Sequence, residues 1–245
     1  MSAGKTPNRS GVCRVTHHFM RDGTLFLIAS PIGNLGDITL RAIEVLKRVT
    51  IVAAEDTRRS SILLKHYEIS KPLISFHEHN EARRTSELIE KLRGGDSVAL
   101  LTDAGMPSIS DPGYRLVRAS VESAIRIEVI PGPSAVLTAL AGSGLPTDRF
   151  YFGGFLPIKS GQRQRELHAA LAREFTSIYF ESPHRIVRSL EVISSIDPGR
   201  SVCVARELTK QFEEYQRGEA ASVLAHYAAR PPKGEITLII KGLCA

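Results

Sequence analysis

The stretch 98–113 constrains the fold more than any other part of the sequence. It opens with the apolar run Val98–Leu101, which is short enough to be a buried strand. A loop rich in Asp, Gly, Ser and Pro follows, and then the amphipathic segment 114–124. We predict Asp111 as a helix N-cap and Pro112 as the first helical residue, because proline has no N–H group to leave unpaired there. In open α/β sheets, loops of this kind bind ligands at the carboxyl ends of strands.

Apolar runs and helical patterns alternate along the rest of the chain. Short apolar runs predict strands at 24–29, 50–54, 73–76, 98–102, 127–130, 150–152, 178–180, 202–205 and 236–240. Amphipathic spacing predicts helices at 38–49, 60–66, 81–93, 114–124 and 186–193. In the first half of the chain, strands that alternate with helices indicate βαβ units and a largely parallel sheet. The predicted fold class is α/β.

Composition divides the chain into three parts. Residues 1–22 are polar and basic, and we predict that they are disordered. The Gly/Pro-rich segment 142–147 is the candidate domain linker. We therefore expect an N-terminal α/β domain over 23–146 and a C-terminal α/β domain over 147–245.

Charge and cysteine content limit the possible partners. The net charge is +6, but half of this excess lies in residues 1–22, so the remainder is compatible with an RNA partner without requiring one. The three cysteines, Cys13, Cys203 and Cys244, lie far apart, which argues against a disulfide framework or a zinc knuckle. No apolar run approaches the ~20 residues that span a bilayer, and no secretory core is present near the N-terminus. We expect a cytoplasmic protein with no membrane partner.

Three predicted strands end in loops rich in glycine and proline, at 30–37, 102–113 and 131–135. Such residues let the main chain approach a ligand closely. Each loop alone is an ordinary turn, but three at one edge of a sheet favour a binding cleft. The loops contain neither GxxxxGK[ST] nor GxGxxG followed by a helix, which argues against a kinase or a nicotinamide enzyme.

Acidic and imidazole side chains in these loops could bind a metal or a ligand. For Asp103 we favour a hydrogen bond to a ligand over a metal, because its loop lacks a further suitable acid once Asp111 is taken as a cap. His77 and His79 lie on one face of a strand end, but no third ligand is evident. We therefore predict no metal.

Two basic segments allow two interpretations each. Arg58 and Arg59 follow a predicted strand and either belong to a solvated helix start or hold a phosphate bidentately. The segment 159–165 is either a solvated loop or a contact for RNA phosphates. The sequence pattern alone does not separate these possibilities.

Eight motifs in order carry a resemblance to a known family. They are SPIGNLGD (30–37), AEDTRR (54–59), FHEHNE (76–81), TDAGMPSISDPG (102–113), PGPSA (131–135), FESPHR (180–185), ARELTK (205–210) and KGE (233–235). Together they resemble the ribosomal RNA small subunit methyltransferase I family, of the tetrapyrrole methylase superfamily, over roughly residues 24–242.

The resemblance implies two α/β domains with S-adenosylmethionine in the cleft between them, and a homodimer. It also implies methylation of a cytidine ribose 2′-hydroxyl in the decoding region of 16S rRNA. The cofactor-binding residues that it implies are Pro31, Asp103, Ile109, Ser134, Ala135, Glu181, Leu208 and Ile236. The candidate general bases are Glu181 and Asp56, and Asp56 has the alternative of a salt bridge with a neighbouring arginine. The residues expected to bind rRNA phosphates are Arg58, Arg59, Lys159, Arg163 and Arg165.

Two other functions remain open at this point. A member of the superfamily could methylate a carbon atom of a tetrapyrrole, although the basic pair Arg58–Arg59 favours RNA. The chain could also be a non-catalytic RNA-binding subunit that has lost its cofactor, although Asp103 and the glycine-rich loops argue against this.

Overall fold

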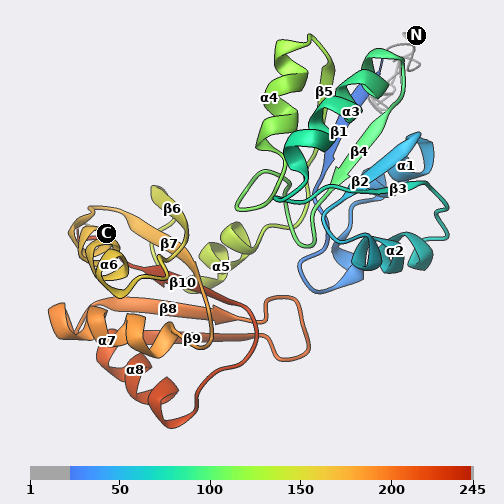
Figure 1. Ribbon diagram of the computed structural model, residues 1–245. Coiled ribbons are helices and arrows are strands. Elements are labelled where there is room, and N and C mark those ends of the chain that lie inside the picture. The colour runs from blue at the N-terminus through green and yellow to red at the C-terminus, as the bar shows by residue number, and fades with distance from the viewer. Residues whose placement is uncertain (1–22, 244–245) are drawn as a thin grey trace, which may run out of the picture.

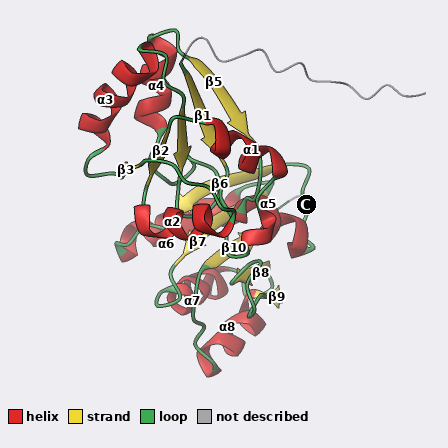
Figure 2. Ribbon diagram, turned by 90° about the vertical axis from the view of Figure 1, so that its right-hand side faces the viewer, coloured by secondary structure: helices red, strands yellow, loops and turns green. Residues whose placement is uncertain are grey.

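A computed structural model describes residues 23–243 and contains two five-stranded sheets. The disorder predicted for residues 1–22 lies outside the described residues. The first sheet contains β1–β5 and the second contains β6–β10, and the two lie one above the other in the views of Figures 1 and 2. Among the described residues, no helix is long and apolar enough to cross a membrane.

The first sheet is parallel throughout and has the strand order β3-β2-β4-β1-β5. Its strands are β1 (Thr24–Ile28), β2 (Ile51–Ala54), β3 (Leu73–Ser75), β4 (Val98–Leu101) and β5 (Arg126–Ile130). The helices between them are α1 (Leu40–Arg48), α2 (Thr57–His66), α3 (Glu81–Arg93) and α4 (Tyr114–Glu122), and a 3₁₀ turn, η1 (Leu35–Asp37), precedes α1. Because all five strands run the same way, their carboxyl ends meet at one edge of the sheet.

Both faces of the first sheet are covered, as a parallel sheet requires. Leu46 of α1 and Leu63 of α2 pack in one core cluster with Ala99 of β4. Leu92 of α3 and Leu116 of α4 pack in another cluster, together with the strand residues that point to the opposite face of the sheet. This two-sided burial explains why the central strands β1, β2 and β4 are continuous apolar runs in the sequence.

The second sheet, in contrast to the first, is mixed. Its order is β6-β7-β10-β8-β9, and only β6 and β7 pair in parallel. The strands are β6 (Phe150–Phe155), β7 (Thr176–Glu181), β8 (Ser201–Arg206), β9 (Glu214–Glu219) and β10 (Ile236–Ile240). The helices of this half are α6 (Ser160–Ala172), α7 (Ile186–Ile196) and α8 (Ala220–Ala229).

Helix α5 (Ala135–Ser143) joins the two halves. Helices α6–α8 share one core cluster with Tyr179 and Leu238. Val136 and Leu140 of α5 pack with the alternate residues of the same strands, on the opposite face. Helix α5 thus precedes the expected domain boundary at 146/147 in sequence but packs on the second sheet. The boundary itself stays a prediction.

Helix α4 begins later than the sequence predicts. Its N-cap is Gly113, with a φ of 139°, so Asp111 is not the cap and Pro112 is not helical. Instead, Oε1 of Glu81 accepts hydrogen bonds from the backbone N–H groups of Gly113 (3.0 Å) and Arg115 (3.3 Å). A side chain from a neighbouring helix therefore satisfies the start of α4, which local sequence reasoning cannot anticipate.

The packing of α5 gives a stability prediction at Gly142. A Cβ atom there would lie 2.5 Å from the ring of Tyr215, whose hydroxyl donates to the Thr138 carbonyl at 3.0 Å. Gly142→Ala should therefore lower the free energy of unfolding by about 1–3 kcal/mol, although alanine is the better helix former. Denaturant titration measures the effect. Gly161→Ala in α6, where the nearest atom is 4.0 Å away, should be neutral or stabilising, and equal effects at both sites would contradict the prediction.

Candidate active site

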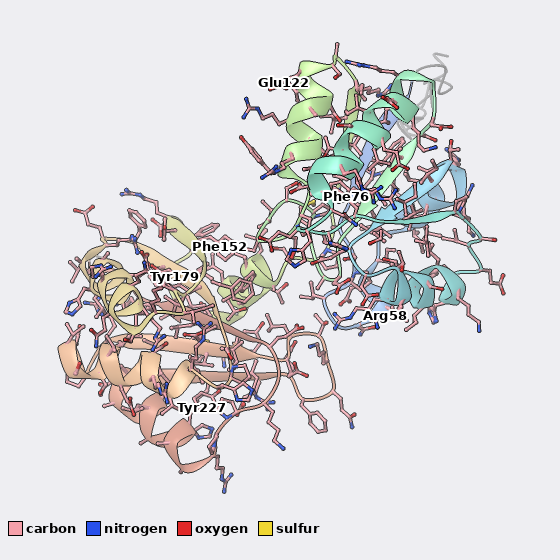
Figure 3. All side chains as sticks on the ribbon, viewed as in Figure 1. Arg58, Phe76, Glu122, Phe152, Tyr179 and Tyr227 are labelled. Atoms are coloured by element: carbon pink, nitrogen blue, oxygen red, sulfur yellow. The ribbon has the colours of Figure 1, made fainter. Side chains whose placement is uncertain are left out.

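A cleft of 440 Å³ lies between the carboxyl edge of the first sheet and the second sheet. Loops after β1, β2 and β4 and the start of α5 form one wall, and the ends of β6, β7, β8 and β10 form the other. Phe152 lies where the second sheet approaches the first (Figure 3). The lining residues are Ile32, Glu55, Arg59, Asp103–Met106, Ile109–Asp111, Ser134–Val136, Phe155, Phe180–Pro183, Ala205, Leu208 and Gly234–Thr237.

The loops after β1 and β4 are joined by backbone hydrogen bonds. Ser30 N–H donates to the Gly105 carbonyl at 2.9 Å, and Gly105 N–H returns a bond to the Ser30 carbonyl at 3.0 Å. The Ser30 hydroxyl also donates to the Thr102 carbonyl at 2.8 Å. Gly105 has a φ of 83°, while Ser108 and Ser110 adopt positive φ values that non-glycine residues rarely take. Strained backbone of this kind is typical of functional loops.

The loops after β2 and β4 hold each other through their carboxylates. Asp103 N–H donates to Glu55 Oε2 at 3.2 Å, and Asp56 N–H donates to Asp103 Oδ1 at 3.1 Å. Arg59 Nη1 lies 3.3 Å from Asp103 Oδ2. These contacts fix the backbone and the Asp103 carboxylate at the edge of the cleft.

The wall formed by the first sheet is acidic. Glu55, Asp103 and Asp111 all line the cleft, with Arg59 as a nearby cation. Burial, followed by the charges of Glu55 and Asp103, raises the pKa of Asp111 to about 7. Burial also raises the pKa of Glu55. Protons can therefore bind at this wall near neutral pH.

The opposite wall is fixed by Glu181. Its side chain is fully buried, and Oε1 lies 2.7 Å from Arg185 Nη2 and accepts the Ser182 N–H at 2.7 Å. Its Oε2 accepts the Ser189 hydroxyl at 2.7 Å. Three partners therefore hold Glu181, and through it they fix the loop that follows β7.

The motifs ARELTK and KGE meet at the same end of the second sheet. Lys210 Nζ bonds to Glu207 Oε1 at 2.8 Å and to Glu235 Oε2 at 3.1 Å. Glu235 N–H donates to Glu207 Oε1 at 2.9 Å. Gly234 has a φ of 89°, and a Cβ there would meet the Glu207 side chain. This network positions Leu208 and Ile236 in the lining.

Most residues expected to bind a cofactor lie in this cleft. The lining includes Asp103, Ile109, Ser134, Ala135, Glu181, Leu208 and Ile236. Pro31 is buried beside the cleft, and its neighbour Ile32 lines it instead.

Several lining residues were not singled out from the sequence. They include Ile32 and Glu55, which lie inside motifs already recognised, so their proximity to the cleft was the missing information. Asp111, which the sequence analysis took for a helix cap, also lines the cleft. Phe155 also lines the cleft, and the only local signal for it was the preceding pair Gly153–Gly154, where the strand pairing shifts register.

Asp56 and Arg58 lie outside the cleft lining. Asp56 caps α2 by accepting the Arg58 N–H at 2.9 Å, and it also pairs with the Arg58 guanidinium at 2.7 Å. These contacts hold the pKa of Asp56 well below its usual range. The salt bridge that was the alternative to a catalytic role for Asp56 is therefore present. Arg59, in contrast, lines the cleft.

The basic segment at 159–165 is the start of α6 rather than a loop. Lys159 and Arg165 are exposed. Arg163 is buried, and its Nη1 donates to the Pro157 and Ile158 carbonyls at 3.3 and 3.0 Å. Its guanidinium is therefore used inside the fold, and we do not retain Arg163 as a phosphate contact.

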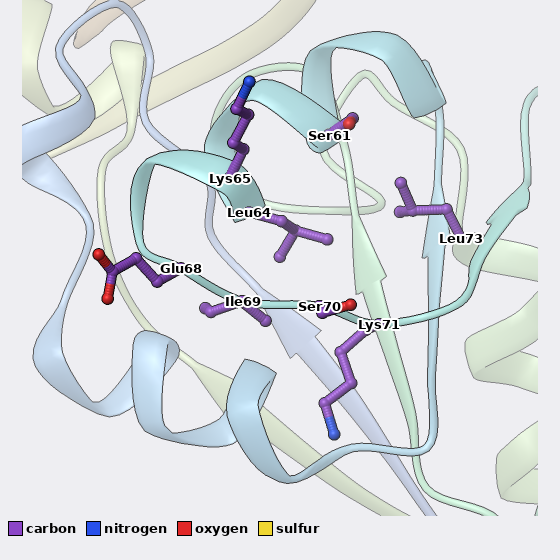
Figure 4. Close-up of a pocket in the computed structure, with 8 residues that line it drawn as sticks. All are labelled: Ser61, Leu64, Lys65, Glu68, Ile69, Ser70, Lys71 and Leu73. Atoms are coloured by element: carbon purple, nitrogen blue, oxygen red, sulfur yellow. The ribbon is translucent and has the colours of Figure 1, made fainter.

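A second pocket, of 360 Å³, lies between α2 and β3 (Figure 4). It is lined by Ser61, Leu64, Lys65, Glu68, Ile69, Ser70, Lys71 and Leu73. Lys65 and Lys71 extend in opposite directions, so their charges do not converge on one point. The cleft between the sheets, where loops from both sheets converge, is the better candidate for chemistry.

The imidazoles of His77 and His79 lie edge to face, with ring centroids 5.9 Å apart. Asn80 Nδ2 lies 3.2 Å from Nε2 of His77. Within residues 23–243, no group of three His, Cys, Asp or Glu side chains is placed to hold a metal ion.

Comparison with known proteins links the chain to one group. Residues 24–224 match the family described as "Tetrapyrrole (Corrin/Porphyrin) Methylases". Proteins named ribosomal RNA small subunit methyltransferase I are similar over about nine-tenths of the chain. The protein from Synechocystis is 48% identical (90% of this chain, 79% of the relative), and that from Mesorhizobium japonicum is 50% identical (88% and 74%). The Thermotoga maritima protein is 44% identical, covering 90% of this chain and 99% of the relative.

Solved structures share the fold at low sequence identity. Uroporphyrin-III-C-methyltransferase from Thermus thermophilus superimposes with a TM-score of 0.64 at 20% identity, covering 91% of this chain and 96% of that chain. Diphthine synthase gives a TM-score of 0.70 at 11% identity, covering 90% of each chain. At 20% and 11% identity, these two likenesses concern the fold alone.

The buried contacts of Glu181 give a second prediction. Glu181→Ala removes the partner of the largely buried Arg185 guanidinium and of the Ser189 hydroxyl, so it should lower the free energy of unfolding by about 3–5 kcal/mol. Glu122→Ala, which removes an exposed pair with Arg118, should change it by no more than about 0.5 kcal/mol. Denaturant titration at neutral pH compares the two, and a small loss at Glu181 would contradict the buried network.

Proposed function

Because the chain belongs to the ribosomal RNA small subunit methyltransferase I family of the tetrapyrrole methylases, we propose that it methylates small-subunit ribosomal RNA with S-adenosylmethionine. The proposed target is the 2′-hydroxyl of a cytidine ribose in the decoding region of 16S rRNA, as the eight motifs imply. The observation that carries the proposal is the 44–50% identity with relatives of this name, which extends across both walls of the cleft.

The chemistry of the cleft fits S-adenosylmethionine. A volume of 440 Å³ lies within the usual range for small-molecule sites, which are mainly apolar with a few placed polar groups. Ile32, Leu208 and Ile236 offer an apolar surface for a purine, and Asp103 offers acceptor atoms for hydroxyl or ammonium groups. The proposed contacts of Pro31, Ile109, Ser134, Ala135 and Glu181 complete the set, with Pro31 acting through the buried loop next to Ile32.

The protein's main task in this reaction is alignment. The sulfonium of the bound cofactor supplies an activated methyl group. The chain must place the attacking ribose oxygen in line with the methyl carbon and the sulfur, and such positioning can supply ~7–11 kcal/mol of the barrier. The joined loops after β1, β2 and β4 and the anchored Glu181 give the two walls the rigidity that this alignment needs. The roles of Glu181 and Asp56 as general base stay predictions.

The proposed RNA surface consists of the exposed cations beside the cleft. Arg58 and Arg59 lie at the start of α2, with side chains 89% and 64% exposed, and Arg59 reaches the cleft lining. Lys159 and Arg165 are exposed at the start of α6. Cations in such positions bind phosphates and position the strand without reading its sequence.

The proposal includes a homodimer in the cytoplasm. Edge strand β6 leaves Phe150, Tyr151 and Phe155 exposed, and Ile158 after it is 82% exposed. An apolar edge strand is a favourable surface for pairing with a second copy. Sedimentation of the purified protein at micromolar concentration tests this. A monomer that still transfers methyl groups would show that the dimer is not required for activity.

Labelling with radioactive S-adenosylmethionine tests the function directly. The full chain is incubated with small ribosomal subunits that lack their modifications, or with naked 16S rRNA, and the label is mapped. We expect label on one cytidine 2′-oxygen. Label on a porphyrinoid instead would favour tetrapyrrole methylation. Calorimetry that shows no binding of S-adenosylmethionine would favour a non-catalytic RNA-binding subunit.

The RNA surface gives a third prediction. Lys159→Ala combined with Arg165→Ala should weaken RNA binding and reduce the slope of log K against log[salt] by about 1–2, because two phosphates lose their cations. Filter binding from low to moderate salt measures the slope. The control pair Lys47→Ala and Arg48→Ala lies at the end of α1, before the amino edge of the first sheet, and should leave the slope unchanged. Equal slopes for both double variants would show that the start of α6 is not part of the RNA-binding surface.

A further inference from the structure

Asp111 has no structural task that explains its place in the cleft. Helix α4 begins at Tyr114 with Gly113 as its N-cap, and Glu81 accepts the first N–H groups of the helix. The side chain of Asp111 is therefore not needed as a cap. It lies instead on the acidic wall of the cleft, half-buried, and the hydroxyl of Thr102 is its hydrogen-bond partner.

We propose that Asp111 is the general base that accepts the proton of the attacking ribose hydroxyl. This inference rests on the proposed function and assigns a role within the same cleft. In the step, the O–H proton passes to an Asp111 oxygen and the ribose oxygen forms a bond to the methyl carbon. The C–S bond breaks, and its electron pair stays on sulfur. The positive charge of the sulfonium is thereby lost, the carboxylate becomes neutral, and no further reactant is needed.

The surroundings of Asp111 keep its carboxylate free for this task. Among residues 23–243 no ion pair engages it, whereas Asp103 is paired with Arg59 and accepts the Asp56 N–H. Glu55 accepts the Asp103 N–H. Each of the other acids on this wall is thus committed to holding a loop.

The two other candidate bases are less suited to accept a proton. Glu181 is held by Arg185, by the Ser182 N–H and by the Ser189 hydroxyl. Asp56 pairs with Arg58 outside the lining, and a carboxylate with a depressed pKa is a weak base.

The electrostatic surroundings also favour proton uptake at Asp111. The charged groups of its own wall are Glu55, Asp103 and Arg59. Glu81 and Arg115 lie at the start of α4. The opposite wall carries Glu181 and Glu235, which pair with Arg185 and Lys210 respectively. Burial and the charges of Glu55 and Asp103 raise the pKa of Asp111 to about 7, and the bond from Thr102 opposes this. A base whose pKa lies near the working pH combines availability with proton affinity.

Single-turnover methylation of the small subunit tests the assignment. Asp111→Asn should lower the rate by about 10²- to 10⁴-fold, with binding of S-adenosylmethionine and RNA changed by less than about threefold. The wild-type rate should rise with pH through about 7, because the base must be deprotonated, and this rise should disappear in the variant. Asp111→Glu should retain part of the rate with a displaced pH profile. The rate should still rise with pH as in the wild type in two comparison variants, Asp56→Asn and Glu181→Gln. It should also do so in Asp148→Asn, which is the exposed control.

Thermal unfolding separates loss of a base from loss of the fold. The folded state raises the pKa of Asp111 above its unfolded value, so the wild type should lose stability as pH rises from about 4 to above 7. Asp111→Asn cannot ionise, so its Tm should equal or exceed that of the wild type at pH 8. A variant that is folded and nearly as fast as the wild type, with the same pH rise, overturns the assignment. Loss of that rise in Glu181→Gln instead would identify Glu181 as the base. If the wild type labels no RNA, the proposed function itself fails.

Discussion

The site depends on the hydrogen bonds that tie together the loops after three parallel strands. A parallel sheet places the carboxyl ends of β1, β2 and β4 side by side, but it does not fix the loops that leave them. The paired bonds between Ser30 and Gly105 and the exchange between Glu55 and Asp103 provide this second level of order. Gly105 makes the first of these contacts possible, because its φ of 83° is unfavourable for residues with a side chain.

The second wall is coupled to the first through helix α5 and a shared apolar cluster. Ile32 from the first loop and Leu140 of α5 pack with Ile178, Cys203 and Ile239 of the second sheet. The cleft is therefore lined by residues whose neighbours belong to one continuous core. A change in packing beneath α5 should therefore reach both walls.

The sequence could predict the elements whose patterns are local, and the exceptions have physical reasons. The central strands β1, β2 and β4 of the first sheet are fully buried and appear as apolar runs, whereas the edge strands β3 and β5 are only partly buried. Strand β9 is a polar edge strand, EYQRGE, and is recognisable only through its pairing with β8. Arg163 looked like a surface cation because the turn that binds its guanidinium is formed by Pro157 and Ile158. Asp111 looked like a helix cap because the competing contact comes from Glu81, thirty or more residues away in sequence.

The charges of the site divide into an acidic interior and a basic exterior, and each suits one part of an RNA substrate. Exposed cations at the starts of α2 and α6 attract phosphates, while the carboxylates inside the cleft repel them. A nucleotide can therefore enter most favourably with its sugar directed inward and its phosphates left outside, as in proteins that bind RNA with bases splayed out of a helix. In that orientation a ribose hydroxyl, rather than a phosphate oxygen, meets Asp111. The same repulsion that raises the proton affinity of the wall thus also selects which oxygen of the RNA can reach it.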